Sequence, residues 1–347
     1  MSSKLDAVMQ AHNKKHGAGT IIKIKDGFKG DYDVIPSGII SIDSATGIGG
    51  FPKGRIVEMY GMESTGKSML FDYIMAEAQK MNGNCVLVDL ENSFDMNFAE
   101  LLGVNKDELI VTQPDFSAEE VFQMIEDLID TKEVDMIVVD SVSALVPKAE
   151  IENEYGASNM GVVARLLSQS MRKLTAKVKN SNCLLGFINQ QRDRIGIMFG
   201  SPKTTSGGNA LKFAASMRLE IKKGQAIKKG DTQIGNEMKI KFSKNKCGGT
   251  PFTEVTVRNI YGEGISKEDS LIEEAVKQNI LDKKGAWYSY NGENISQGKD
   301  NLIEKLKEDR ELYKDIYDKT YAMMISKKAN VREILNAENM EEEKVEE

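Results

Sequence analysis

The chain has 347 residues, of which 40% are hydrophobic and 29% are charged, and its net charge is −7. This composition is typical of a globular protein with one large domain and one or two small ones. No apolar run approaches the roughly 20 residues that cross a bilayer, the polar N-terminus lacks a signal-peptide core, and the three cysteines show no paired spacing, so we expect a cytoplasmic protein with no membrane partner, disulfide framework or zinc site.

The negative charge is unevenly distributed. Residues 338–347 hold six glutamates and one lysine, so the rest of the chain is close to neutral. The negative total therefore does not exclude a local basic groove for nucleic acid. We expect residues 336–347 to form an acidic, disordered tail.

The N-terminal segment, residues 1–32, predicts a short helix over residues 4–16 and then an apolar strand, GTIIKI. These two elements are too small to bury a core of their own. We therefore expect them to pack on the main domain or on a neighbouring subunit, as an oligomerisation segment.

Strand and helix patterns alternate over the first part of residues 33–265, which we expect to form the core domain. Continuous apolar runs such as VDMIVVDS are typical of central parallel strands. The expected strands are 55–60, 85–91, 108–114, 134–141 and 182–190, and the expected helices are 68–80, 118–130 and 161–180. This order predicts an α/β fold with a mostly parallel, twisted sheet flanked by helices.

The pattern changes after the core alternation. Residues 190–209 show no helix or strand pattern, and loops of this length are usually functional or disordered. Antiparallel strands are then expected at 216–223, 236–246 and 252–265. Residues 266–335 predict a small α+β C-terminal domain with a hairpin around an Asn-Gly turn at 291–292.

A phosphate-binding motif lies between the first core strand and its helix. The sequence GMESTGKS fits G-x-x-x-x-G-K-[ST] in the strand-to-helix context that the motif requires. Its glycines let backbone N–H groups surround phosphate oxygens, Lys67 can reach the β- and γ-phosphates, and Ser68 can ligate Mg²⁺. The predicted cofactors are ATP and Mg²⁺, and the motif residues are Gly61, Met62, Glu63, Ser64, Thr65, Gly66, Lys67 and Ser68.

Three polar residues end other core strands, at the edge where open α/β sheets bind ligands. Asp140 ends the run MIVVD and is expected to hold Mg²⁺ with Ser68. Glu91 ends the predicted strand 85–91 and is the best candidate to orient or deprotonate water. Gln190 can hydrogen-bond a γ-phosphate, and because it also begins the long loop, nucleotide state can set the conformation of that loop.

These residues, together with longer stretches, resemble the bacterial RecA recombinase family. The matching stretches are GRIVEMYGMESTGKS, VDMIVVDSVSALVPKAEIE, MGVVARLLSQSMRKL, FINQQRDRIGIMFG, TTSGGNALKF, KNK, YGEGI and GAWYSYNGE, in family order over about residues 20 to 300. This is far more specific than a phosphate-binding loop alone.

The resemblance implies two DNA-binding loops, near residues 154–161 and 190–209. Glycines there offer backbone N–H groups to phosphates, arginines supply positive charge, and two apolar residues match those that wedge between bases. The implied DNA-binding residues are Met160, Arg165, Arg172, Arg192, Arg194, Ile195, Gly207, Gly208 and Asn209.

The resemblance also implies an ATP site shared between subunits. Lys244 and Lys246 would neutralise γ-phosphate charge in the adjoining subunit. Asp95, Phe98, Tyr261 and Gly262 are further nucleotide-binding candidates. Phe213 and the N-terminal segment are implied subunit contacts, and head-to-tail contacts that do not close generate helical filaments.

This chain departs from the usual family pattern at four positions. Phe98 stands where a tyrosine is usual near the adenine, and Asn159 replaces a frequent histidine. Lys203 replaces an acidic residue, and Asp193 stands where the family is usually uncharged. We expect these changes to tune DNA affinity or its salt response.

The resemblance implies a DNA-dependent ATPase that forms a helical filament on single-stranded DNA and exchanges strands with homologous duplex DNA. Lys67, Glu91 and Gln190 are the implied catalytic residues, and a damage-response repressor is a further implied partner. A hexameric DNA helicase with a related core, or an ATPase that does not act on DNA, such as a regulatory ATPase or small-molecule kinase, are the alternatives.

Overall fold

The computed structural model describes residues 4–16, 21, 23, 32–152, 161–193 and 203–326. Contacts divide the chain into two units, Met1–Tyr32 and Asp33–Glu347, which are treated separately below. Of the expected strand GTIIKI only Ile21 and Lys23 are described, and neither lies in a strand; the acidic tail lies outside the described residues.

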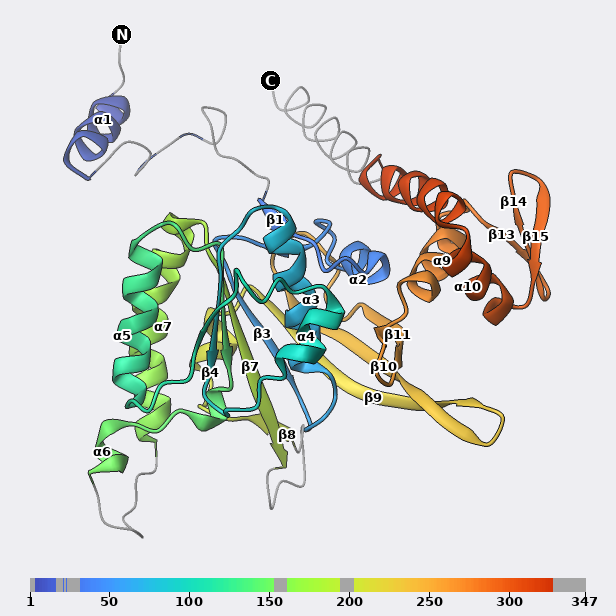
Figure 1. The fold of residues 1–347 in the computed structure, drawn as a ribbon. Coiled ribbons are helices and arrows are strands. Elements are labelled where there is room, and N and C mark those ends of the chain that lie inside the picture. Colours follow the sequence, from blue (N-terminus) through green and yellow to red (C-terminus); the bar gives the residue numbers. More distant parts are fainter. Residues whose placement is uncertain are drawn as a thin grey trace. The chain divides into compact units, whose positions relative to one another are not determined.

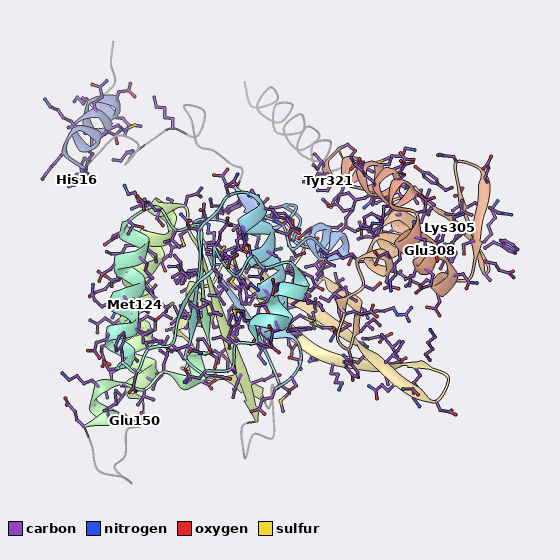
Figure 2. The ribbon with its side chains drawn as sticks, viewed as in Figure 1. His16, Met124, Glu150, Lys305, Glu308 and Tyr321 are labelled. Carbon is purple, nitrogen blue, oxygen red and sulfur yellow. The ribbon has the colours of Figure 1, made fainter. Side chains whose placement is uncertain are left out.

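The first unit contains helix α1 (Lys4–His16), as the sequence predicts. Asp6 lies in its first turn and three basic residues, ending at His16 (Figure 2), lie in its last turn, so both ends complement the helix dipole. No residue of α1 is buried, and Leu5 and Val8 are 63% and 52% exposed. The helix therefore presents apolar side chains that its own unit does not cover.

A large sheet forms the centre of the second unit (Figure 1). Its strands follow the order β12-β11-β10-β9-β3-β7-β6-β4-β5. The strands from β9 to β5 are parallel, and β10, β11 and β12 extend the sheet antiparallel. The bounds are β3 (Ile56–Gly61), β4 (Cys85–Asp89), β5 (Ile110–Thr112), β6 (Met136–Asp140), β7 (Leu184–Asp193), β9 (Met217–Lys229), β10 (Thr232–Asn245), β11 (Glu254–Ile260) and β12 (Gly264–Ile265).

Helices cover both faces of this sheet (Figure 1). α5 (Ala118–Asp130) and α7 (Val162–Ser181) pack on one face, in a core cluster with apolar residues of β3, β4, β6 and β7. α3 (Lys67–Lys80) and α4 (Met96–Leu102) lie over the other face, where a Cβ on Gly186 would come within 2.5 Å of the Phe71 ring. Every residue of β3, β4 and β6 is buried, so these strands are covered on both faces, which explains their continuous apolar sequences.

Short elements complete the core. They are β1 (Val34–Ile35), α2 (Ile40–Ala45), β2 (Phe51–Pro52), the 3₁₀ turn η2 (Val142–Ala144), α6 (Lys148–Ile151), β8 (Lys203–Thr205) and α8 (Ala210–Ala214). β1 and β2 pair with each other, and β8 pairs with the end of β7.

A smaller α+β section follows β12. It consists of α9 (Lys267–Lys277), β13 (Asp282–Lys284), β14 (Trp287–Tyr290), β15 (Glu293–Gln297), α10 (Lys299–Glu308) and a helical stretch over 310–326. Positive φ angles of 51° and 85° at Asn291 and Gly292 form the expected turn between β14 and β15. Lys305, labelled in Figure 2, donates to the carbonyl of Ile295 at 3.1 Å and ties α10 to this sheet.

Hydrogen bonds join the α+β section to the core. The N–H of Ser41 donates to Ser270 Oγ at 3.0 Å, and the two hydroxyls lie 2.7 Å apart. Ile40 of α2 also packs in the apolar cluster of α9, α10, β14 and β15. The predicted fold class is confirmed: a mostly parallel α/β core with a small α+β section after it.

Several predicted boundaries were wrong, and two of them concern the polar residues at the strand ends. β4 ends at Asp89 and not at Glu91, because Asp89 turns its side chain to cap the following segment. The stretch 190–209 is also not free of strands, since β7 continues to Asp193 and pairs antiparallel with β8, with Gln191 opposite Thr205. Within the described segments, none of the helices combines the length and the hydropathy needed to cross a bilayer.

Candidate active site

Strand register brings the predicted site residues to one edge of the sheet. β3, β7, β6 and β4 are neighbours in that order. Gly61 lies opposite Gln190, and Asp89 lies opposite Asp140, at the carboxyl ends of these parallel strands. The phosphate-binding loop starts directly from β3, so it stands at the same edge.

The loop from Gly61 to Ser68 requires its two glycines. Gly66 is the N-cap of α3 with a left-handed φ of 91°, a conformation that other residues rarely adopt. A Cβ on Gly61 would lie 2.2 Å from the carbonyl oxygen of Ile221 on β9. No side chain caps the start of α3, so its first N–H groups stay available to an anion.

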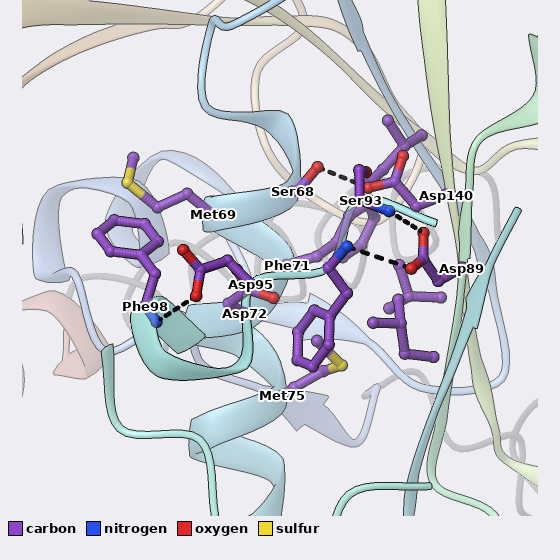
Figure 3. A pocket seen from close by; sticks show the side chains of 14 residues that line it. Ser68, Met69, Phe71, Asp72, Met75, Asp89, Ser93, Asp95, Phe98 and Asp140 are labelled. Atoms are coloured by element: carbon purple, nitrogen blue, oxygen red, sulfur yellow. Dashed lines mark hydrogen bonds between the residues drawn. The ribbon is translucent and has the colours of Figure 1, made fainter. Parts of the chain in front are cut away.

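Lys67 and Ser68 begin α3 and face two different partners. Lys67 Nζ donates to the carbonyl of Met62 at 2.7 Å, across the loop. Ser68 Oγ donates to Asp140 Oδ2 at 2.6 Å, which joins the loop to the end of β6 (Figure 3). The predicted Mg²⁺ ligands, Ser68 and Asp140, are therefore in direct contact.

The electrostatics of this edge favour a cation. Burial raises the pKa of Asp140 to about 6, against the hydrogen bond from Ser68, and the carboxylates of Glu91 and Asp89 add to the rise. Burial also lowers the pKa of Lys67, although nearby carboxylates oppose this. Several carboxylates thus lie near a single positive charge, that of Lys67, and a divalent ion would reduce the repulsion between them.

The donor set fits Mg²⁺ bound together with a nucleotide. Mg²⁺ is usually held by one or two protein ligands, with the remaining positions taken by phosphate oxygens and water. Ser68 and Asp140 supply such a pair, and the described residues contain no group of three or more His, Cys, Asp or Glu side chains that could hold a metal by themselves.

Glu91 lies in the segment after β4, and two residues hold its side chain. Its Oε1 accepts a hydrogen bond from Gln190 Nε2 at 3.1 Å and a short one from the Ser141 hydroxyl. Its backbone N–H points to the Asp140 carbonyl at 3.3 Å. The structure therefore brings the predicted water-orienting carboxylate and the predicted phosphate-sensing amide into contact.

Ser141 is a site residue that the sequence reasoning missed. It follows Asp140 directly, and its Oγ lies 2.5 Å from Ser143 Oγ as well as contacting Glu91. The signal was present in the sequence, because a hydroxyl next to a metal-binding aspartate at a strand end lies within reach of the neighbouring strand end.

A cavity of about 190 Å³ extends from the metal-ligand pair to the predicted adenine residues (Figure 3). Ser68 and Asp140 line it, as do Asp95 and Phe98. Asp95 is the N-cap of α4 and accepts from the N–H of Phe98 at 3.0 Å, so backbone geometry fixes both. The cavity also contains Asp72, whose pKa burial raises to about 7.

Four other predicted nucleotide-binding residues lie elsewhere in the same chain. Lys244 ends β10 opposite Arg218, towards the other edge of the sheet, and its Nζ donates to the carbonyls of Lys212 and Phe213 at 2.9 and 3.0 Å. Lys246 is exposed just beyond it. Tyr261 and Gly262 form the turn between β11 and β12. No residue of this group contacts the loop from Gly61 to Ser68 within the ranges that the structure describes.

The predicted DNA-binding residues are only partly described. Arg165 and Arg172 are exposed on α7, and Arg192 is one of the last residues of β7. Asn209 is the N-cap of α8. Met160, Arg194, Ile195 and Asn159 lie outside the described residues.

Gly207 and Gly208 anchor the end of the second loop against α7. Both have left-handed φ angles, 79° and 76°. A Cβ on Gly207 would lie 2.2 Å from Leu167 Cδ1, and one on Gly208 would lie 3.1 Å from Ala164 Cβ. α7 begins immediately after the predicted first loop, so the described ends of both predicted loops meet at its first turns.

Comparisons with known proteins agree with this architecture. The RecA N-terminal domain family matches residues 3–266, and the RecA C-terminal domain family matches residues 269–324. Proteins named RecA from Francisella tularensis subsp. novicida (strain U112) and subsp. tularensis (strain WY96-3418) are each 52% identical to this chain over 305 residues, which is 88% of this chain and 84% of theirs.

A solved structure of the RadB recombinase has a similar fold, with a TM-score of 0.50 and 21% identity, over 67% of this chain and 98% of that one. The fold agrees with the RadB structure, and the family matches extend over nearly the whole described chain. The chain belongs to the RecA family of recombinases.

Proposed function

We propose that this chain is a DNA-dependent ATPase that assembles a helical filament on single-stranded DNA and exchanges its strand with homologous duplex DNA. The nucleotide would be ATP bound with Mg²⁺. The substrates would be single-stranded DNA and a homologous duplex, with recognition by base pairing and not by side-chain readout.

One observation carries this proposal. Gln190 belongs at once to the candidate active site and to the strand that leads into the predicted DNA-binding loop. Its amide donates to Glu91 at 3.1 Å, and three residues later β7 ends in its pairing with β8. A change at the nucleotide would therefore reach the base of the loop through one rigid strand.

The chain's own residues supply the polar chemistry of hydrolysis. ATP with Mg²⁺, when bound, supplies the bond that is cleaved and most of the charge neutralisation. Glu91 accepts both of its described side-chain hydrogen bonds at Oε1, which leaves Oε2 to accept a proton from water. Lys67 and the N–H groups at the start of α3 stabilise negative charge where it develops.

The proposal of self-assembly is supported by large apolar side chains that are exposed on a single chain. Phe213 is 73% exposed beside Lys212, whose carbonyl accepts from Lys244. Leu5 and Val8 are exposed on α1. Two different surfaces on one chain fit a head-to-tail contact, which does not close and so produces a filament.

The decisive experiment measures ATP hydrolysis with and without single-stranded DNA, followed by strand exchange between a circular single strand and a linear duplex. We expect DNA to stimulate hydrolysis at least tenfold, and Lys67→Ala to eliminate hydrolysis because it removes the phosphate contact. Equal rates with and without DNA would favour an ATPase of another kind. Closed rings in electron micrographs, in place of filaments, would favour a helicase.

A further inference from the structure

A buried polar network joins three strands behind the candidate active site. Glu58 of β3 is fully buried and accepts at Oε2 from Arg218 Nε of β9 at 2.5 Å. Its Oε1 accepts from Asn189 Nδ2 of β7 at 3.0 Å. Asn189 is also fully buried, and the guanidinium of Arg218 lies 4.5 Å from the centroid of the Tyr60 ring.

Asn189 reaches beyond the sheet to the end of the second loop. The same Nδ2 donates to the carbonyl oxygen of Ser206 at 3.1 Å. Ser206 directly precedes the two glycines that pack against α7. One buried amide thus connects an ion pair at the centre of the sheet to the point where the chain returns from residues 194–202.

The side chains of Asn189 and Gln190 point to opposite faces of the sheet, because successive side chains in a strand alternate in direction. Gln190 points to the α3 face and contacts Glu91. Asn189 points to the α7 face, where Phe187, two residues earlier, packs with Leu167 in the core cluster. The contact with Glu91 at the candidate active site and the contact with the loop are therefore made by consecutive residues of one strand.

The orientation of the Asn189 amide follows from its partners. Glu58 and the Ser206 carbonyl can only accept hydrogen bonds, so both must face Nδ2. Within the described part of the chain, Asn189 Oδ1 and Ser206 Oγ are buried without a hydrogen-bonding partner. These two atoms are a matched acceptor and donor on residues already in contact, so a small shift of Ser206 can exchange one hydrogen bond for the other.

We infer that Asn189 is a positioning residue that couples the ATP site to the DNA-binding loop. Its amide bonds both the buried Glu58–Arg218 pair and the Ser206 carbonyl. Movement of β7 at Gln190 would therefore change the hydrogen bond between Asn189 and Ser206 at the base of the loop. This inference rests on the proposed function and deepens it, because it names the contact through which nucleotide state would alter the affinity for DNA.

The test compares DNA affinity in two nucleotide states. Single-stranded DNA binding is measured by fluorescence anisotropy with ADP and with a non-hydrolysable ATP analogue, and the ratio of the two affinities reports the coupling. In Asn189→Leu we expect this ratio to fall about fivefold, the effect of one buried hydrogen bond. Affinity for the ATP analogue without DNA should stay within about twofold of the wild type, since the hydrogen bonds described for the Asn189 side chain go to Glu58 and Ser206 and not to the loop from Gly61 to Ser68.

A second variant tests the same contact with a side chain that is less disruptive to folding. Asn189→Thr keeps a hydroxyl that can donate to Glu58, and its shape suits a strand, but a hydroxyl has only one proton and cannot also serve Ser206. It should fold as the wild type does and lose the coupling. Asn236→Leu is the matched control, because Asn236 is a buried amide of β10 that donates only to the adjacent Glu237 carbonyl at 2.7 Å.

The outcomes separate the inference from the function beneath it. A wild-type protein with no nucleotide-dependent DNA binding would overturn the proposed function itself. A wild type that shows this dependence, beside an Asn189→Thr variant that folds normally and keeps the full ratio, would overturn only the role of Asn189. The inference also fails if Asn236→Leu reduces the ratio as much as Asn189→Leu does.

Discussion

Two side chains, those of Ser141 and Gln190, orient Glu91. The Ser141 hydroxyl donates to Glu91 Oε1, and Gln190 donates to the same oxygen, so the carboxylate has little freedom to turn. A carboxylate that must face an attacking water gains from this restriction, because a small misplacement reduces the rate greatly. Ser141 is therefore more important to the chemistry than its position outside the phosphate-binding motif indicates.

Ser141→Ala should lower kcat for ATP hydrolysis by about tenfold, the effect of losing a hydrogen bond to a charged group. KM should change less than about twofold, because the hydrogen bonds described for the Ser141 hydroxyl go to Glu91 and Ser143 and not to the phosphate-binding loop. Steady-state kinetics with saturating DNA separate the two parameters. Ser143→Ala, which removes a hydroxyl that contacts only Ser141, should have a clearly smaller effect. A rise in KM with unchanged kcat would contradict this role of Ser141.

Asp72 makes the stability of the nucleotide-free protein depend on pH. Burial first, and then the charge of Asp140, raise its pKa from 3.8 to about 7. An acid with a raised pKa binds its proton more tightly in the folded state, so the free energy of unfolding falls as the pH rises from about 4 to 7. At neutral pH and above, Asp72 is thus a buried charge that destabilises the fold.

Asp72→Asn should increase the free energy of unfolding at pH 8 by on the order of 2 kcal/mol, and the gain should vanish below about pH 4, where both side chains are neutral. Urea unfolding at several pH values, without nucleotide or metal, measures this. Asp107→Asn, at an exposed position, should change little at any pH. An equal gain at pH 4 and pH 8 would show that packing, and not charge, is responsible.

At the scale of elements, the pairing of β7 with β8 defines the base of the second loop. Asp193 lies opposite Lys203, two of the positions where this chain departs from the usual family pattern. The two departures are therefore complementary in charge, which the sequence could not reveal because it does not show that these residues are partners.

Replacing Arg192 and Arg194 together with glutamine should weaken binding to single-stranded DNA and flatten its salt dependence. The slope of log K against log salt should fall by roughly 0.7 for each lost phosphate contact. Titrations between low and high salt measure it. Lys106→Gln with Lys132→Gln removes the same charge from other exposed positions and should leave the slope unchanged. An unchanged slope in the arginine variant would remove these residues from the DNA path.

The sequence predicted elements better than contacts. MIVVD and CVLVD became β6 and β4 because continuous apolar runs are stable only as buried central strands. The contacts of Ser141 with Glu91 and of Asn189 with Ser206 join residues 50 and 17 positions apart. Such contacts depend on strand order and register, which local patterns do not contain.

For the whole molecule, the proposed assembly would depend on surfaces that one chain leaves uncovered. Leu5 and Val8 are three residues apart on α1 and so lie on one side of it. Leu5→Ser with Val8→Ser should shift sedimentation towards monomers and shorten filaments in electron micrographs, because burial of two aliphatic side chains is lost at every contact. Lys14→Ser on the same helix is the control. Filaments of normal length in the double variant would exclude α1 from the contact.

Lys244 shows how such an assembly can form at small entropic loss. Its ammonium group has three protons, and two of them already bond the carbonyls of Lys212 and Phe213. A free lysine side chain gives up about 2 kcal/mol of rotamer entropy when it is fixed. Here most of that loss occurs when the protomer folds, and in the proposed filament the third proton would be left for a phosphate of the adjoining subunit. A joining subunit would then meet a cation that is already immobilised.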